Sequence, residues 1–189
     1  MFGARRAGGR CRLRRTVVQA QLIRTARLEL VPLEVAHAEE MARVLGDPGL
    51  HTFIGGEPYR EAELRARYER LVGGAPDPGT AWLNWVVRIT EERVLAGTVQ
   101  ATVDLTHRTA EIAWITGTPW QGRGIASEAA KALADALAAG RIAGPIDIVL
   151  AHVHPEHHAS AAVARAAGLC PTDVHQDGEV RWIRRTTAV

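Results

Sequence analysis

The chain has 189 residues, of which 47% are hydrophobic and 23% charged, and its formal net charge is +2. This length suits a single well-filled domain. No run of about 18 apolar residues is available to cross a bilayer, and Cys11 and Cys170 form neither a disulfide framework nor a zinc-binding spacing. We therefore expect a cytoplasmic protein with no membrane partner and no metal.

The start of the chain is basic, because eight arginines precede Glu29, which is the first acidic residue. A segment of this composition buries too little apolar surface to fold alone. The sequence predicts a disordered basic extension over residues 1–21 and one domain over residues 22–189. A mitochondrial presequence has a similar composition and stays an alternative for the extension. The remainder is acidic, so we expect no nucleic-acid partner.

Hydrophobic periodicity predicts the secondary structure of the domain in chain order. Strands are expected at residues 27–33, 82–89, 94–103, 110–116, 146–153 and 180–184, and helices at 34–45, 60–72, 127–139 and 158–167. The three central strands are joined by short polar links, which is typical of an antiparallel meander. The resulting order is β-α-α-β-β-β-α-β-α-β.

A glycine-rich loop lies between the expected strand 110–116 and the following helix. It reads Gln121-Gly122-Arg123-Gly124-Ile125-Ala126. Glycines allow backbone N–H groups to converge on one point, and a helix N-terminus adds unsatisfied amides and a positive dipole end. Ser127 or a loop amide could cap the helix, and Arg123 would add a positive charge. The loop therefore predicts a phosphate or pyrophosphate site.

Other nucleotide loops fit these residues less well. A dinucleotide-binding fingerprint needs a third glycine where Ser127 stands, and an acid about 20 residues later. A P-loop needs a Gly-Lys-Ser/Thr ending, which the sequence lacks. A glycine-rich turn that binds no ligand is the remaining alternative.

Three segments in the right order resemble motifs of the GNAT acetyltransferase superfamily. The loop resembles the [QR]-x-x-G-x-[GA] pyrophosphate motif. The opening at residues 23–33 and the strand Ala110-Glu111-Ile112-Ala113-Trp114-Ile115 are similar to strands of its ribosomal-protein alanine N-acetyltransferase branch. Residues 154–163 resemble the fourth-helix motif H-P-x-N-x-x-S-x-x-V. The resemblance covers approximately residues 23 to 170.

The resemblance implies an α/β (α+β) GNAT fold, with a mixed, mostly antiparallel sheet of six to seven strands and about four helices. Strands four and five would splay apart to admit the pantetheine arm of acetyl-CoA, the implied cosubstrate. The implied cofactor-binding residues are Ile115, Gly117, Gln121, Gly122, Arg123, Gly124, Ile125, Ala126, Ser127 and His157. His157 stands where the motif has an asparagine, so its role is open.

Transfer of an acetyl group needs one group to accept the amine proton and one to protonate the thiolate. Glu111, an acid on an apolar strand, is the candidate base, directly or through water; a solvent-facing strand glutamate is the alternative. Ser160, on the motif serine, is the candidate acid, although a helix serine without a role fits equally. Many superfamily members carry a tyrosine where Ala164 stands.

The acceptor pocket is expected between the first two helices, the Gly55-Gly56 loop and the central strands. Candidate wall residues are Trp82, Trp85, Trp114 and Trp120, and candidate amine-selecting residues are Glu57, His107, His175 and Asp177. Two functions stay open: an enzyme that acetylates a protein N-terminus or a small amine in a ternary complex, and a non-catalytic acyl-CoA-binding protein. The chain would act as a monomer or homodimer.

Overall fold

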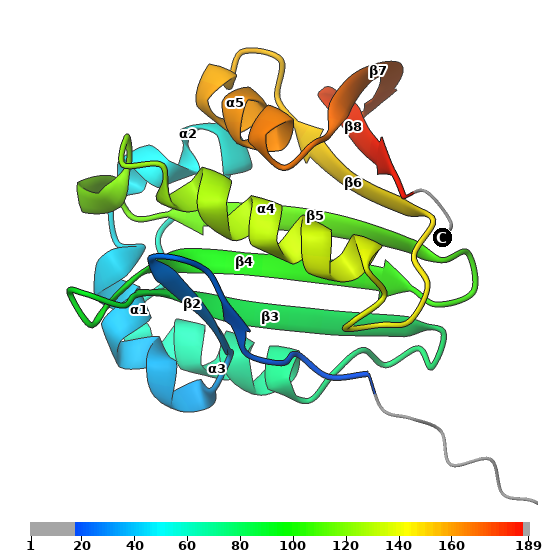
Figure 1. Cartoon of the computed structure of the whole chain (residues 1–189). Coiled ribbons are helices and arrows are strands. Elements are labelled where there is room, and N and C mark those ends of the chain that lie inside the picture. Colours follow the sequence, from blue (N-terminus) through cyan, green and yellow to red (C-terminus); the bar gives the residue numbers. More distant parts are fainter. Residues whose placement is uncertain (1–17, 187–189) are drawn as a thin grey trace, which may run out of the picture.

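The computed structural model describes residues 18–186 as one α/β domain (Figure 1). Its centre is an eight-stranded sheet with the strand order β1-β2-β3-β4-β5-β6-β8-β7. The strands are β1 Ile23–Arg24, β2 Leu28–Pro32, β3 Thr80–Ile89, β4 Val94–Asp104, β5 Thr109–Thr116, β6 Ile148–Val153, β7 Cys170–Gln176 and β8 Glu179–Arg185. All neighbouring strands pair antiparallel except β5 and β6, which are parallel. The expected mixed, mostly antiparallel sheet is confirmed, with eight strands instead of six to seven.

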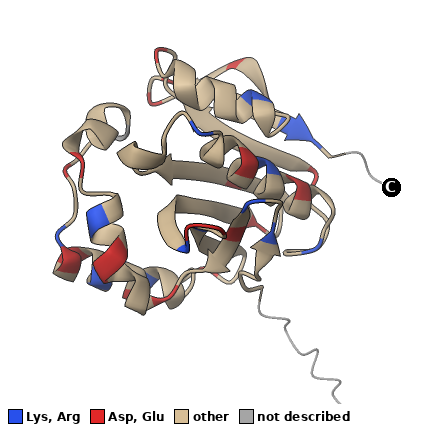
Figure 2. Cartoon of the chain, turned by 60° about the vertical axis from the view of Figure 1, so that its left-hand side comes forward, with Lys and Arg blue, Asp and Glu red and all other residues tan. Residues whose placement is uncertain are grey.

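Helices cover both faces of this sheet (Figure 1). They are α1 Ala38–Val44, α2 His51–Ile54, α3 Glu61–Val72, α4 Ile125–Ala138 and α5 His158–Ala166. Helices α4 and α5 pack with one sheet face in the larger hydrophobic cluster, and α1 and α3 pack with the other face in the smaller one. Residues of both signs of charge are interspersed over the chain (Figure 2). No helix within residues 18–186 is long and apolar enough to span a membrane.

The two sheet faces follow from the alternation of side chains along each strand. On β5, Ala110 and Ile112 are buried in the larger cluster beneath α4. Glu111 and Ala113, which alternate with them, are exposed and point to the opposite face. The second face of β5 is thus open for a functional site, while the first is used for packing.

Strands β5 and β6 diverge after a short region of pairing. Their ladder joins only Thr109 to Ile148, Ala110 to Val149 and Glu111 to Leu150. The part of β5 beyond Glu111 therefore lies apart from β6, although both strands continue. Strands β5 and β6 correspond to the fourth and fifth strands expected from the sequence, so the expected splay is present. It exposes one backbone edge of β5.

Three elements escaped the sequence analysis. Strand β1 has two residues, α2 has four and β7 is mostly exposed, so none carries enough hydrophobic periodicity to be detected. Strand β7 forms a hairpin with β8 through Asp177 and Gly178, which both have positive φ angles of 50° and 84°. Asp-Gly is a strong hairpin signal, and it is present in the sequence at these two positions.

The basic extension lies mainly in residues 1–17, outside the described part of the chain. Residues 18–21, which were assigned to it, run along the domain. Val18 and Ala20 pack against the larger cluster, and the indole of Trp85 donates to the Gln21 carbonyl at 2.8 Å. These four residues are therefore part of the folded unit.

Candidate active site

The glycine loop and the start of α4 form a group of backbone amides directed at one point. Gly124 is the N-cap residue of α4 and has a φ angle of 77°, a left-handed conformation that glycine adopts without strain. The amide of Glu128 makes the first intrahelical bond, to Gly124 O at 3.0 Å. The amides of Ile125, Ala126 and Ser127 consequently have no acceptor inside the helix. This geometry is suited to an anion.

The helix begins at Ile125, two residues earlier than expected, and no side chain caps it. Ser127 lies inside the first turn, so its suggested role as a cap is wrong. The two positive φ angles at Gly122 and Gly124 tighten the loop, which lets the helix start earlier than the hydrophobic pattern indicates. The first turn thereby leaves three amides free, whereas a capping serine hydroxyl would have occupied one of them.

Side chains around the loop hold it against the rest of the domain. Glu128 accepts hydrogen bonds from Thr25 Oγ1 at 2.6 Å and from Arg27 Nε at 2.7 Å. Burial alone would raise the pKa of Glu128, but these bonds outweigh it and lower the pKa. The guanidinium of Arg27 also donates to the Arg123 carbonyl at 3.3 Å. Thus α4 and its loop are fixed to the turn before β2, a contact that the sequence analysis missed.

Arg123 does not present a free charge to the loop in this structure. Its guanidinium pairs with the carboxylate of Glu92, in the turn between β3 and β4. This hydrogen bond lowers the pKa of Glu92 and raises that of Arg123. An arriving phosphate would have to compete with Glu92 for Arg123, whereas the helix amides are available to it.

The exposed edge of β5 is set by the pairing of β4 and β5. The amide of Gly117 donates to Ala96 O at 2.9 Å, and its carbonyl accepts from Trp120 N at 2.9 Å. Alternate residues of an antiparallel strand turn their backbone groups to opposite sides. Ile115, two residues before Gly117, therefore also faces β4, while Trp114 and Thr116 turn their backbone groups to the splay.

Gly97 brings β4 unusually close to β5 at this point. A Cβ atom at Gly97 would lie 2.2 Å from the Ile115 carbonyl oxygen and 2.9 Å from the Cα of Thr116. No side chain fits there without moving the backbone of β5. Gly97 therefore controls the position of the edge that borders the splay.

Glu111 lies on the open face of the sheet and takes part in a chain of polar side chains. Its Oε1 is 2.9 Å from Nδ1 of His152, and Arg181 Nε donates to the other ring nitrogen of His152 at 3.3 Å. Since Nε2 accepts this bond, Nδ1 carries the proton and donates to Glu111. The His152 side chain is 10% exposed and that of Glu111 is 51% exposed. The carboxylate is thus oriented by a buried ring yet accessible to a ligand.

The other residues expected on the fourth-helix motif lie on α5 and the turn before it. Ser160 is half-buried and makes no side-chain hydrogen bond within residues 18–186. His157 stacks on Phe53 of α2, with ring centroids 4.3 Å apart. Burial lowers the pKa of His157, and nearby His154 adds to this effect. The stack joins α2 to the turn between β6 and α5.

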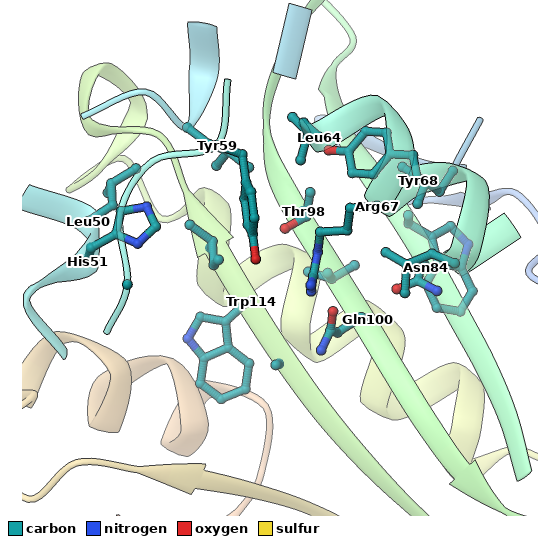
Figure 3. A pocket seen from close by; sticks show the side chains of 18 of the residues that line it. Leu50, His51, Tyr59, Leu64, Arg67, Tyr68, Asn84, Thr98, Gln100 and Trp114 are labelled. Atoms are coloured by element: carbon teal, nitrogen blue, oxygen red, sulfur yellow. The ribbon is translucent and has the colours of Figure 1, made fainter. Parts of the chain in front are cut away.

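A cavity of about 460 Å³ opens on the second face of the sheet (Figure 3). Its floor comes from β3, β4 and β5, and its walls from α3 and from the segment between α2 and α3. Tyr59, Arg67 and Gln100 point into it from three different elements (Figure 3). A cavity therefore exists at the place where the acceptor pocket is expected, between the first helices, the Gly55-Gly56 loop and the central strands.

Only some of the residues suggested for this pocket line it. Trp85, Trp114 and Glu57 do, although Trp85 is wholly buried and Glu57 is exposed. The other five lie elsewhere. Trp82 lines an adjoining hollow, Trp120 packs against both hydrophobic clusters, and His107, His175 and Asp177 belong to exposed turns and strands away from the cavity.

Arg67, Tyr59 and Gln100 were not selected from the sequence. Their positions in the cavity depend on how α3 and β4 meet, and no local motif reports that. Four histidines, His152, His154, His157 and His158, stand close together in the sequence, and neutral imidazoles are good metal ligands. In the part of the chain that the structure describes, no three His, Cys, Asp or Glu side chains are grouped to hold a metal ion.

The free amides at the start of α4, the splayed strands and the cavity lie within one domain, and β5 borders both the splay and the cavity. A model of the acetyltransferase (GNAT) domain matches residues 27–169. The chain belongs to this family, whose members are acetyl-CoA-dependent N-acetyltransferases. Curated proteins yield no match.

Solved structures with the same fold include several acetyltransferases. A GNAT-family acetyltransferase from Bacillus anthracis is 19% identical, with a TM-score of 0.72 over 88% of this chain and 99% of that one. The ribosomal L7/L12 α-N-protein acetyltransferase RimL, solved with coenzyme A, is 18% identical, with a TM-score of 0.71 and coverage of 87% and 98%. A spermidine N-acetyltransferase from Vibrio cholerae, solved with CoA and spermine, is 18% identical, with a TM-score of 0.67 and coverage of 86% and 97%.

Proposed function

We propose that this protein transfers the acetyl group of acetyl-CoA to a primary amine, by direct attack within a ternary complex. One observation carries the proposal: Trp114 and Ile115 of β5 line the cavity beside the splayed edge of the same strand. A donor in the splay and an acceptor in the cavity would meet at β5. Their reacting atoms would then be held together, which removes much of the entropic barrier.

The donor half of the complex rests on backbone groups. The pyrophosphate of CoA would lie against the amides of Ile125, Ala126 and Ser127, and the pantetheine arm would enter the splay. The alternation along β5 favours pairing of this arm with Trp114 and with the amide of Thr116, whose carbonyl already accepts a hydrogen bond from Gln121 Nε2 at 3.1 Å. This shifts by one residue the pairing that the sequence indicated at Ile115 and Gly117, because the amide and carbonyl of Gly117 are bonded within the chain.

In the proposed reaction, the neutral amine attacks the thioester carbonyl, a C–N bond forms and the C–S bond breaks. Glu111 would accept the amine proton. Its Cα lies about 7 Å along the strand from that of Ala113, which lines the cavity, so a water molecule would relay the proton. The CoA thiolate would take its proton from Ser160 or from water.

The test is release of free thiol from acetyl-CoA over a panel of polyamines, aminoglycosides, amino acids and N-terminal peptides. We expect turnover with at least one amine and intersecting initial-rate patterns when both substrates are varied. Parallel rate patterns would contradict direct attack. An inactive panel with intact CoA binding would favour the alternative of a non-catalytic acyl-CoA-binding protein, which the absence of a tyrosine at Ala164 suggests.

A further inference from the structure

The polar lining of the acceptor cavity has one cationic side chain that is buried in part and has no acidic partner. Arg67 of α3 is half-buried, and within residues 18–186 it forms no ion pair, whereas Arg65 on the same helix pairs with Glu61 at 3.2 Å. Among the described residues that line the cavity, Glu57 is the one carboxylate, and it is exposed. The interior of the cavity therefore carries an uncompensated positive charge.

The guanidinium of Arg67 is held in place by its neighbours. It lies 5.6 Å from the ring centroid of Tyr59, a distance at which cation–π attraction operates. The hydroxyl of Tyr59 and the amide of Gln100 point towards the same space (Figure 3). A guanidinium, a hydroxyl and an amide all donate hydrogen bonds, which is a set that recognises an anionic oxygen group.

A second hollow of about 290 Å³ adjoins the cavity and extends the same character. The two share Arg67, Leu71, Asn84 and Gln100, and the second adds Arg70 but no carboxylate. Its floor includes Thr102, which lies opposite Glu111 in the β4–β5 ladder. The cationic region and the candidate base thus border one continuous surface of the sheet.

We infer that the acceptor is an amine that also carries an anionic oxygen group, a carboxylate or a phosphate, which binds Arg67. This rests on the proposed function, since it names the class of amine for that site. Arg67 and Gln100 rise above β3 and β4, so the anion lies one or two strand spacings, about 5–10 Å, from the edge of β5. The amine and the anionic group of such an acceptor are therefore separated by a similar distance. A polycation would be repelled by the positive charge of Arg67.

The experiment compares amines that differ only in the anionic group, with saturating acetyl-CoA for the kinetics and saturating CoA for the binding measurement. Alanylglutamate amide is set against alanylglutamine amide, phosphoethanolamine against ethanolamine, and spermidine serves as the polycation. Both kcat/KM and the rise in Tm on binding are measured. We expect the anionic member of at least one pair to be favoured about tenfold or more, because a charge-assisted hydrogen bond is made only by that member. The pair in which the anionic member is favoured identifies the anionic group as a carboxylate or a phosphate.

The variant Arg67→Gln should reduce this preference to about threefold or less, and Arg67→Glu should reverse it in favour of spermidine. Arg65→Gln is the matched control on the same helix and should keep the wild-type preference. CoA binding should be unchanged in all three variants, which shows that they fold.

Two results would overturn the inference: a neutral amine or spermidine bound and acetylated as well as the anionic partners, or an anionic preference that survives Arg67→Gln. If no amine is acetylated but the anionic members still raise Tm through Arg67, the anion site stands and the proposed enzymatic function fails. If amines are acetylated without any anionic preference, the proposed enzymatic function stands and the anion site fails.

Discussion

The proposed donor side and the proposed acceptor side of this domain are built in different ways. The donor side consists of backbone groups from one continuous segment, β5 through α4, and its geometry depends on the conformations of Gly122 and Gly124. The acceptor side consists of side chains from α3, β3, β4 and the segment after α2. A backbone site within one segment tolerates most changes of side chain, whereas a site assembled from distant elements changes its selectivity with single substitutions.

The largest effect is expected where the two sides meet, at Glu111. The substitution Glu111→Gln keeps an oxygen for the bond from His152 but removes the proton acceptor. We expect kcat to fall by about 10²- to 10⁴-fold with little change in CoA binding. Steady-state thiol release checks this, with Glu69→Gln on the exposed surface of α3 as control. An unchanged kcat would assign the base to another residue.

A smaller effect is expected at Gly97, which supports the donor side from behind. In Gly97→Ala the new Cβ must displace the Ile115 carbonyl, because the two would otherwise be 2.2 Å apart. We expect a loss of about 1–3 kcal/mol in the free energy of unfolding, together with weaker CoA binding. Denaturant unfolding and CoA titration measure both.

The matched control for Gly97→Ala is Gly79→Ala, where the nearest atom is the flexible Asp77 carboxylate at 3.3 Å. If Gly79→Ala loses as much stability as Gly97→Ala, the loss comes from replacing a glycine in general and not from the contact with β5.

On the acceptor side, Tyr68 combines burial with an unused hydroxyl. It is 3% exposed, and its hydroxyl has no hydrogen-bond partner within the described chain. We expect Tyr68→Phe to raise the free energy of unfolding by about 1 kcal/mol, because it removes an unsatisfied buried group. Urea unfolding measures this, with the exposed Tyr59→Phe as the comparison.

Burial also raises the pKa of Tyr68 to about 12. The unfolded chain releases this proton first, so the wild-type free energy of unfolding should fall between pH 10 and pH 12 relative to that of Tyr68→Phe. Parallel pH curves for the two proteins would show that the hydroxyl is not buried.

The smallest effect concerns the stack that joins α2 to the turn before α5. Because burial lowers the pKa of His157, the unfolded chain binds a proton there more readily than the folded one. Stability should therefore decrease as the pH falls below 6.5, and Tm should change less between pH 7.5 and 5.5 in His157→Asn. His158→Asn, at an exposed neighbour, should behave as wild type. A variant as pH-sensitive as the wild type would exclude His157 as the cause.

The sequence was sufficient for the elements whose signals are local. The alternation in β3, β4 and β5 and the helical pattern of α3 reflect burial on one face, and the glycine loop is a short motif in a fixed place. The four-residue helix α2 and the exposed strand β7 carry too few apolar residues for such a signal. For β7, the sequence signal that could have been used is the Asp177-Gly178 turn, which predicts a hairpin with β8.

The site residues that sequence could not supply are those held by tertiary contacts. Glu111 was selected as an acid on an apolar strand, but its partner His152 comes from β6, across the short parallel ladder. Arg67 acquires its position only when α3 packs against α1 and β3. Such pairings depend on the register of the sheet and the placement of helices, which no local pattern in one sequence reports.

Calorimetric titration with CoA tests the separation of the two sides most directly, in wild type, Gly124→Trp and Arg67→Gln. Gly178→Trp controls for a bulky residue at a positive φ angle, since Gly178 has open space around it. We predict that Gly124→Trp loses CoA binding, because the indole fills the approach to the helix amides, and that the other proteins bind as wild type. Unchanged binding by Gly124→Trp, or loss of binding in Arg67→Gln, would contradict a donor site formed by the loop and an acceptor site formed by the cavity.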